Sequence, residues 1–170
     1  MQRLKYLHHY NEEIRHQVRQ LIDQETLGGY ILSRYPECHP YATDKTLYDY
    51  VVGFKNTHFR QSSPISKVYY DTKIRDLQSA LGTHTFVSRV QGGRLKAKNE
   101  IRISHLFKKV PEPFLRMIVV HELAHFKEKE HNKAFYKLCT HIEPHYHQIE
   151  FDVRLYLTYL DTAMHPLWAR

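Results

Sequence analysis

Apolar residues gather most densely between Phe114 and Val120, where Arg116 alone interrupts the run FLRMIVV. In a chain with many charged residues, such a run predicts a helix that is buried on most sides. Pro111 and Pro113 suit the first turn of this helix, because a missing N–H group costs no hydrogen bond there. Three polar residues stand at its end: His121, Glu122 and His125.

Two amphipathic helices are predicted upstream of this segment. Apolar residues recur at helical spacing after Asn11, a suitable helix start, and the stripe continues to about Gln24. The pair at 28–29, Gly-Gly, predicts a break after this helix. A second apolar stripe follows Thr43, a suitable capping residue, and extends to His58.

Alternating β-forming residues predict a small sheet just before the buried helix. Residues 67–71 have strand character, and residues 83–91 and 95–104 predict two further strands joined by a Gly-Gly turn at 92–93. The pattern over residues 74–81 fits either a helical turn or an irregular strand. We therefore expect an antiparallel sheet, with residues 83–90 or 100–104 at its edge.

Two more helices are predicted after the buried one, over residues 132–141 and 145–162. Helices, then a small sheet, then helices indicate an α+β fold. A length of 170 residues predicts a single domain over 1–170. Within it we expect a metal-binding core at about 66–162 and an N-terminal helical part at about 1–60.

Composition bounds the function without defining it. The chain shows no signal-peptide pattern and no apolar run long enough to span a membrane, so we predict a cytoplasmic protein without membrane contact. Cys38 and Cys139 are far apart, which argues against a disulfide framework. The net charge of +7 allows nucleic acid as a partner, although scattered lysines and arginines are more often solvated surface.

The spacing HExxH at the end of the buried helix predicts a metal site. Two histidines four residues apart share one helix face, so His121 and His125 can converge on one ion. His131 is the best third ligand, which leaves one position open, as catalytic zinc sites require. Glu122 is placed beside the ion, where a general base belongs. We therefore predict Zn²⁺ on His121, His125 and His131.

Two other readings of this segment have to be weighed. A pair of buried structural histidines would give the same spacing, although an apolar helix is the context expected for a metal site. The metzincin signature also spaces its histidines in this way, but it has glycine where this chain has Glu128. The chain must therefore leave the helix by a different route before Asn132, which suits the cap of the next helix.

The segment HELAHFKEKEHNKAF resembles the YgjP-like zinc metallopeptidases and, more distantly, the SprT-like and WLM-type proteases. Further stretches with this resemblance are PYATDKTLYDY, ALGTHTFVSRVQGGRLKAKNEIRIS and EPHYHQIEFDVRLYLT, so it covers nearly the whole chain. It implies a zincin-like fold, in which a small antiparallel sheet and flanking helices pack on the HExxH helix. It also implies zinc on the three histidines and Glu122 as base.

These features predict a zinc-dependent metallopeptidase that hydrolyses polypeptides with a metal-activated water, Glu122 serving as general base. An edge strand of the sheet would then bind the extended substrate. Two alternatives stay open: a nucleic-acid-associated protein with a structural zinc, and a metal-dependent hydrolase of a non-peptide substrate.

Several residues could support the site. Oxyanion donors and carboxylates that orient the ligands are both common around catalytic zinc. The candidate oxyanion donors are Tyr146, His145 and His147. The candidate orienting carboxylates are Glu143, Glu150 and Asp152.

Overall fold

The structure is a computed structural model that describes residues 2–74, 85–91 and 94–168. Its elements in chain order are η1 (Gln2–Leu7), α1 (Glu12–Asp23), α2 (Leu27–Arg34), α3 (Asp44–His58), β1 (Ile65–Asp71), β2 (Thr85–Gln91), β3 (Arg94–Ser104), η2 (His105–Phe107), α5 (Glu112–Ala124), α6 (Lys133–Ile142) and α7 (Tyr146–Ala163). This arrangement confirms the α+β class. The part of 74–81 beyond Ile74 and the turn at 92–93 lie outside the described residues.

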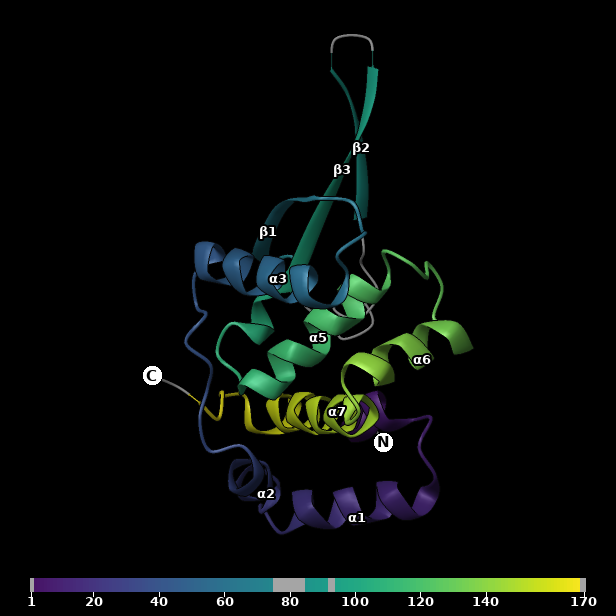
Figure 1. Cartoon of the computed structure of the whole chain (residues 1–170). Helices are drawn as coiled ribbons and strands as arrows, with labels where there is room; N and C mark the ends of the chain where they lie inside the picture. The colour runs from purple at the N-terminus through teal and green to yellow at the C-terminus, as the bar shows by residue number, and fades with distance from the viewer. Residues whose placement is uncertain (1, 75–84, 92–93, 169–170) are drawn as a thin grey trace.

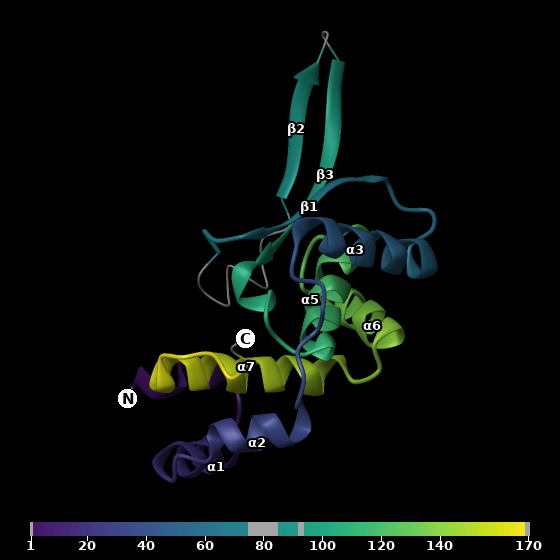
Figure 2. The ribbon, with the colours of Figure 1, turned by 90° about the vertical axis from the view of Figure 1, so that its left-hand side faces the viewer.

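The elements stack in layers around α5 (Figures 1 and 2). Helices α1 and α2 lie below α7, and α5 and α6 lie above it, whereas α3 and the sheet form the layer beyond α5. Strands β2 and β3 extend away from the helices as a long hairpin. Helix α5 contacts β3, α6 and α7, so the segment with the HExxH spacing packs between the sheet and the C-terminal helices.

The sheet is mixed, so the prediction of a purely antiparallel sheet was wrong. β2 and β3 pair antiparallel as expected, but β1 pairs with β3 in parallel, in the order β1-β3-β2. A parallel neighbour was missed because strand direction depends on the long connection after β1, which the local alternation does not encode. Over residues 99–104, one side of β3 is paired with β1, whereas β2 pairs with the other side only as far as Glu100.

The upstream helices form where their caps predict. The Asn11 side chain accepts a hydrogen bond from the Ile14 N–H group at 2.9 Å, and Thr43 forms a capping box with Thr46. Gly28, by contrast, does not break a helix. It lies in the first turn of α2, where a β-carbon would come 2.8 Å from the Tyr159 ring of α7. The glycine is therefore explained by close helix packing.

The core is built on α5. Every residue of this helix from Met117 to Ala124 is buried, which confirms the prediction drawn from its apolar run. Phe135 and Cys139 of α6 are fully buried, and α7 contributes Ile149 and Val153 to the same core. Among the helices of the described part of the chain, none has the length and apolar character that crossing a membrane requires.

An ion-pair network ties α5 to the α6–α7 connection. Arg116 donates from Nε to Oε2 of Glu143 and from Nη1 to Oε2 of Glu112, each at 2.5 Å. Tyr50 of α3 donates to Oε1 of Glu112 at 2.6 Å. The Glu143 side chain is only 9% exposed, so water solvates its carboxylate poorly and the ion pair with Arg116 stabilises the charge.

Replacing Arg116 by methionine is expected to lower the free energy of unfolding by about 3 kcal/mol, because it strands the charge of Glu143 in a poorly solvated position. Urea unfolding of Arg116→Met gives this value. The double variant Arg116→Met/Glu143→Gln removes the stranded charge and is expected to regain much of the loss. A double variant as unstable as the single one would contradict this explanation.

His39 connects the segment between α2 and α3 to η2. Its Nε2 lies 2.7 Å from the Phe107 carbonyl oxygen, and its Nδ1 accepts from the Tyr41 N–H group at 3.0 Å. The ring therefore donates from Nε2 and is neutral. Burial lowers the pKa of His39 below its ordinary value of 6.5.

We expect His39 to make stability depend on pH. Because its pKa is lower in the folded state, the unfolded chain takes up a proton first as the pH falls through 6.5. The stability it contributes is complete above that pH and decreases below it. Urea unfolding at pH 7.5 and at pH 5.0 measures the free energy of unfolding. Its decrease between these two pH values should be larger for the native protein than for His39→Gln. Equal losses would show that another group is responsible.

Candidate metal centre

The structure brings the three predicted histidines together. The Nε2 atoms of His121, His125 and His131 lie 3.3, 3.0 and 3.1 Å from one another. Helix α5 ends at Ala124, and His125 is its C-cap with helical backbone angles, so the first two rings keep the expected i, i+4 relation. His131 reaches them from the connection to α6, which begins after the cap residue Asn132.

The outer nitrogens of two of these rings have defined partners. Nδ1 of His121 lies 2.7 Å from the hydroxyl oxygen of Tyr146, and Nδ1 of His125 lies 2.9 Å from the carbonyl oxygen of Glu128. The Glu128 carbonyl can only accept, so His125 carries its proton on Nδ1 and directs a lone pair from Nε2 into the cluster. The sequence does not predict this contact, because a backbone acceptor leaves no signal in residue type.

Phe135 of α6 fixes the positions of all three imidazoles. Its ring centroid lies 4.9 Å from that of His121, 4.6 Å from that of His125 and 5.0 Å from that of His131. Because Phe135 is fully buried, it closes one side of the cluster to water. His131 is exposed, whereas His121 and His125 are buried, so the cluster opens towards solvent on the His131 side.

Glu122 is fully buried and follows His121 directly on α5. Its charge acts on the neighbouring Tyr146, whose pKa is raised well above the ordinary 10.0 mainly by burial and further by nearby acidic groups, Glu122 among them. A carboxylate is costly to bury without a compensating interaction. Glu122 is completely buried, whereas Glu112, in the first turn of the same helix, is partly exposed.

The carboxylates predicted to orient the ligands have other partners. Glu143 binds Arg116, and Glu150 accepts from Nη2 of Arg154 at 2.9 Å. Asp152 accepts from the Tyr35 hydroxyl group at 2.6 Å. Nδ1 of His121 and Nδ1 of His125 lie instead next to the Tyr146 hydroxyl group and the Glu128 carbonyl group, so the prediction that these carboxylates orient the two rings was wrong. Glu143 is the C-cap of α6, whereas Glu150 and Asp152 lie within α7, and residue type alone does not show where their side chains point.

The predicted oxyanion donors are also placed differently. The Tyr146 hydroxyl group lies at the Nδ1 edge of His121, on the far side of the ring from the three Nε2 atoms. His147 packs its ring on Tyr136 and lines a separate groove with Phe151. His145 is the exposed N-cap residue of α7, and its backbone N–H group donates to Oε1 of Glu143 at 3.1 Å.

The three histidines fit a tetrahedral metal ion. Two nitrogens bound to one zinc at about 2.0–2.1 Å are roughly 3.3–3.4 Å apart, close to the separations found here. Three lone pairs directed at one point repel one another unless a cation lies between them. The negative end of the α5 dipole at Ala124 also favours a cation there. Three imidazoles leave a fourth coordination position for water or substrate.

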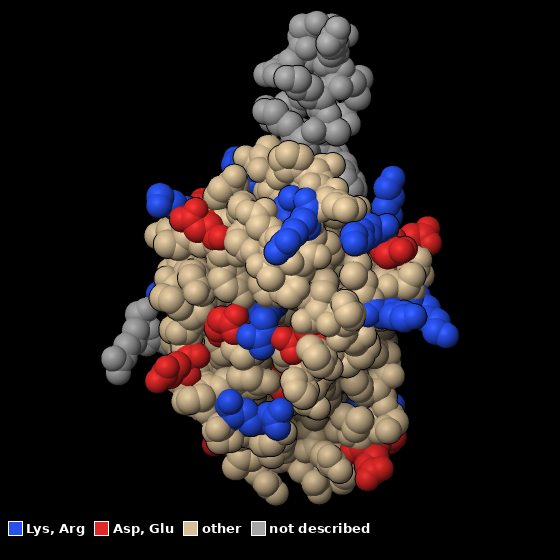
Figure 3. All heavy atoms as spheres, in the orientation of Figure 1, with Lys and Arg blue, Asp and Glu red and all other residues tan. Residues whose placement is uncertain are grey.

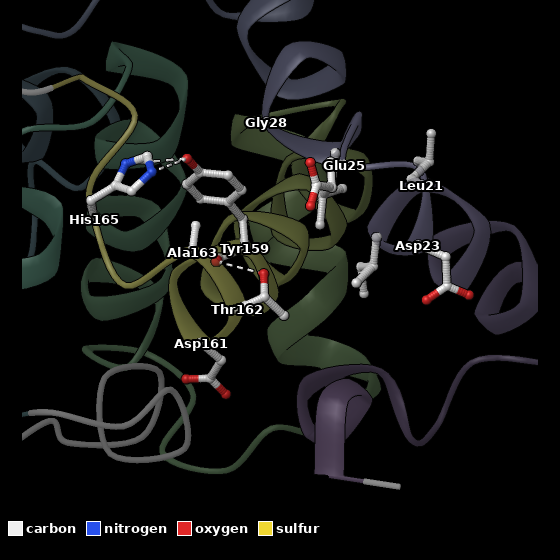
Figure 4. A pocket seen from close by; sticks show the side chains of 11 residues that line it. Leu21, Asp23, Glu25, Gly28, Tyr159, Asp161, Thr162, Ala163 and His165 are labelled. Carbon is white, nitrogen blue, oxygen red and sulfur yellow. Dashed lines mark hydrogen bonds between the residues drawn. The ribbon is translucent and has the colours of Figure 1, made fainter.

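A separate hollow of about 750 Å³ lies between the ends of α1 and α7 (Figure 4). Asp23, Glu25, Tyr159 and Asp161 are among its lining residues, and Tyr159 is hydrogen-bonded to His165. Tyr146 stands at the start of α7, and thirteen residues of helix place Tyr159 roughly 20 Å further along. The hollow is therefore not part of the metal centre.

Charge is mixed on the face of the molecule that Figure 3 presents. Lysine and arginine side chains alternate there with aspartate and glutamate. A surface that binds nucleic acid through its phosphates would gather positive charge into a patch or stripe. The positive net charge of the sequence is not concentrated in this way on that face.

The geometry and the comparisons with known proteins agree on a class. The chain matches the YgjP-like, metallopeptidase domain over residues 88–153, which includes all three histidines and Glu122. The histidine cluster and this match define a metal-dependent hydrolase. The chain is also 58% identical over 167 residues to the UTP pyrophosphatase of Escherichia coli (strain K12), across 98% of this chain and 100% of that protein. It therefore belongs to the YgjP-like family. No solved structure matches the chain.

These comparisons correct the predicted activity. The expectation of a protease with a polypeptide substrate was wrong, because a relative this similar over its whole length is named for hydrolysis of a nucleotide. The HExxH spacing places a metal and a base, but it does not select the bond that is cleaved. The alternative of a non-peptide hydrolase, also drawn from the sequence, is the one that the comparison supports.

Proposed function

We propose that this protein is a zinc-dependent nucleotide pyrophosphatase that hydrolyses UTP to UMP and pyrophosphate. His121, His125 and His131 hold the metal, and Glu122 is the general base. One observation carries the proposal. The relative named UTP pyrophosphatase is 58% identical to a chain whose buried Glu122 adjoins three convergent imidazoles.

The reaction needs a water molecule to attack the α-phosphorus while the bond from that phosphorus to the bridging oxygen breaks. Glu122 accepts the proton that the attacking water loses, and pyrophosphate departs with the bridging oxygen. A zinc ion held by the histidines would act as a Lewis acid towards phosphate oxygens and water. Burial of Glu122 keeps its carboxylate from being surrounded by bulk water.

The charge of the site suits a polyphosphate. All three ligands are neutral imidazoles, and the partners of the two outer nitrogens, the Tyr146 hydroxyl group and the Glu128 carbonyl group, are neutral as well. The ligands themselves therefore leave the charge of a divalent ion intact, and the single carboxylate of Glu122 beside the ion would offset only part of it. The ion would therefore attract a strongly anionic substrate, and the opening on the His131 side gives that substrate access.

Residues 1–170 would form one catalytic domain in this protein, because η1, α1 and α2 all pack on α7, the helix that carries Tyr146. Zinc is the metal proposed, since a tetrahedral set of imidazole nitrogens with one open position is typical of catalytic zinc.

Product analysis tests the proposal. The purified protein with zinc is incubated with UTP, and UMP, UDP, pyrophosphate and orthophosphate are separated by ion-exchange chromatography. We expect UMP and pyrophosphate in equal amounts. UDP with orthophosphate would show cleavage at the other phosphoanhydride bond, and intact UTP would contradict the proposed substrate.

A further inference from the structure

We propose that Tyr146 is a positioning residue for the metal centre: its hydroxyl group accepts the Nδ1–H of His121 and fixes the tautomer that presents Nε2 to the ion. The inference rests on the ligand set in the proposed function, but it does not depend on the identity of the substrate. It assigns to this tyrosine a place behind the ligand and not among the groups that touch the nucleotide.

The position of the hydroxyl group is set by the fold. Tyr146 is fully buried at the first residue of α7, and its ring is nearly parallel to that of His121, at an interplanar angle of 12°. Its backbone N–H group donates to the Glu143 carbonyl at 2.9 Å, and the Glu143 carboxylate binds Arg116 on α5. The Tyr146 hydroxyl group and its partner His121 are therefore both held to α5, His121 as a residue of that helix and Tyr146 through Glu143 and Arg116.

The choice of tautomer follows from the three Nε2 atoms. They lie within 3.3 Å of one another, so each must offer a lone pair when an ion binds. A neutral imidazole with a lone pair on Nε2 carries its proton on Nδ1. In His121, Nδ1 lies 2.7 Å from the Tyr146 hydroxyl oxygen, which can accept this proton. The contact therefore favours the tautomer that can bind metal.

The neutral character of the partner has a further consequence. Metal-bound histidines often donate to carboxylates, which raise the basicity of the ligand. Here His121 and His125 have a phenol and a backbone carbonyl as partners. Both orient a ring without adding negative charge, which leaves the ion more electrophilic towards a phosphate group.

The experiment compares Tyr146→Phe with Tyr156→Phe, which removes the hydroxyl group of another buried tyrosine on α7. Tyr156 packs against Phe114 and Trp168, away from the three histidines. Zinc affinity is measured on metal-free protein by competition with a chromophoric chelator, in the absence of nucleotide. We expect Tyr146→Phe to bind zinc about 10–100-fold more weakly than the native protein. Tyr156→Phe should bind as the native protein does.

Thermal unfolding of the metal-free proteins separates positioning from stability. A merely structural tyrosine would lower the unfolding temperature in both variants and leave zinc affinity unchanged, and that result would overturn the inference. The zinc affinity of Tyr146→Phe is measured without nucleotide, so it can be interpreted even if the protein does not hydrolyse UTP. Conversely, an unchanged zinc affinity in this variant would leave the product analysis of the native protein unaffected.

A second measurement uses the native protein, in case Tyr146→Phe does not fold. Nitrogen-15 NMR of the zinc-loaded protein should show an Nδ1 proton on His121 that exchanges slowly with solvent and lies close to the Tyr146 ring. A proton on Nδ1 that exchanges as fast as one on an exposed histidine would contradict the inference.

Discussion

Replacing Glu122 by glutamine is expected to reduce UTP hydrolysis by about 10²–10⁴-fold while zinc content stays at the native level. The amide matches the carboxylate in size but cannot accept the proton of the attacking water. Pyrophosphate release at saturating UTP measures the loss, and elemental analysis measures the zinc.

Glu130→Gln is the matched control for this variant. Glu130 is an exposed carboxylate in the connection between α5 and α6, close to the histidines in sequence. Its removal should leave the rate nearly unchanged. If Glu122→Gln retained native activity with native zinc content, the general base would have to be another group, and the role assigned to Glu122 would be wrong.

Replacing His131 by alanine is expected to weaken zinc binding by more than the roughly 10–100-fold loss typical of an outer-sphere partner, because it removes one of three direct ligands. His131 is exposed, so the variant should keep its fold. UTP hydrolysis should vanish when zinc is supplied at one equivalent per chain. Chelator competition and pyrophosphate release measure the two effects.

His141→Ala serves as the control for the loss of a histidine. His141 is an exposed residue near the end of α6, the helix that follows His131. This variant should bind zinc and hydrolyse UTP as the native protein does. Equal zinc affinity in His131→Ala and His141→Ala would show that His131 is not a ligand.

Local patterns predicted much of the fold. The caps at Asn11, Thr43 and Asn132 and the apolar run of α5 all lie where the sequence indicates, because each depends on residues within one or two turns. The parallel pairing of β1 and the packing role of Gly28 depend on distant segments. Neither could be predicted from neighbouring residues.

In the candidate site too, features set by neighbouring residues could be predicted, whereas features set by distant segments could not. HExxH and a histidine six positions on predict the convergence of three imidazoles, since helix geometry and a short connection determine it. The partners of the outer nitrogens, Tyr146 and the Glu128 carbonyl, depend on how α7 and the turn after α5 pack. The substrate was missed for a different reason. The same metal and base can activate water towards a carbonyl or a phosphoryl group.

Zinc titration into the metal-free native protein tests the central claim most directly. Pyrophosphate release from UTP is recorded as zinc is added, with unbound metal removed before each assay. Our account predicts a rate that rises in proportion to zinc and reaches its maximum at one equivalent per chain. Full activity in the metal-free protein, or no pyrophosphate at any zinc content, would contradict it.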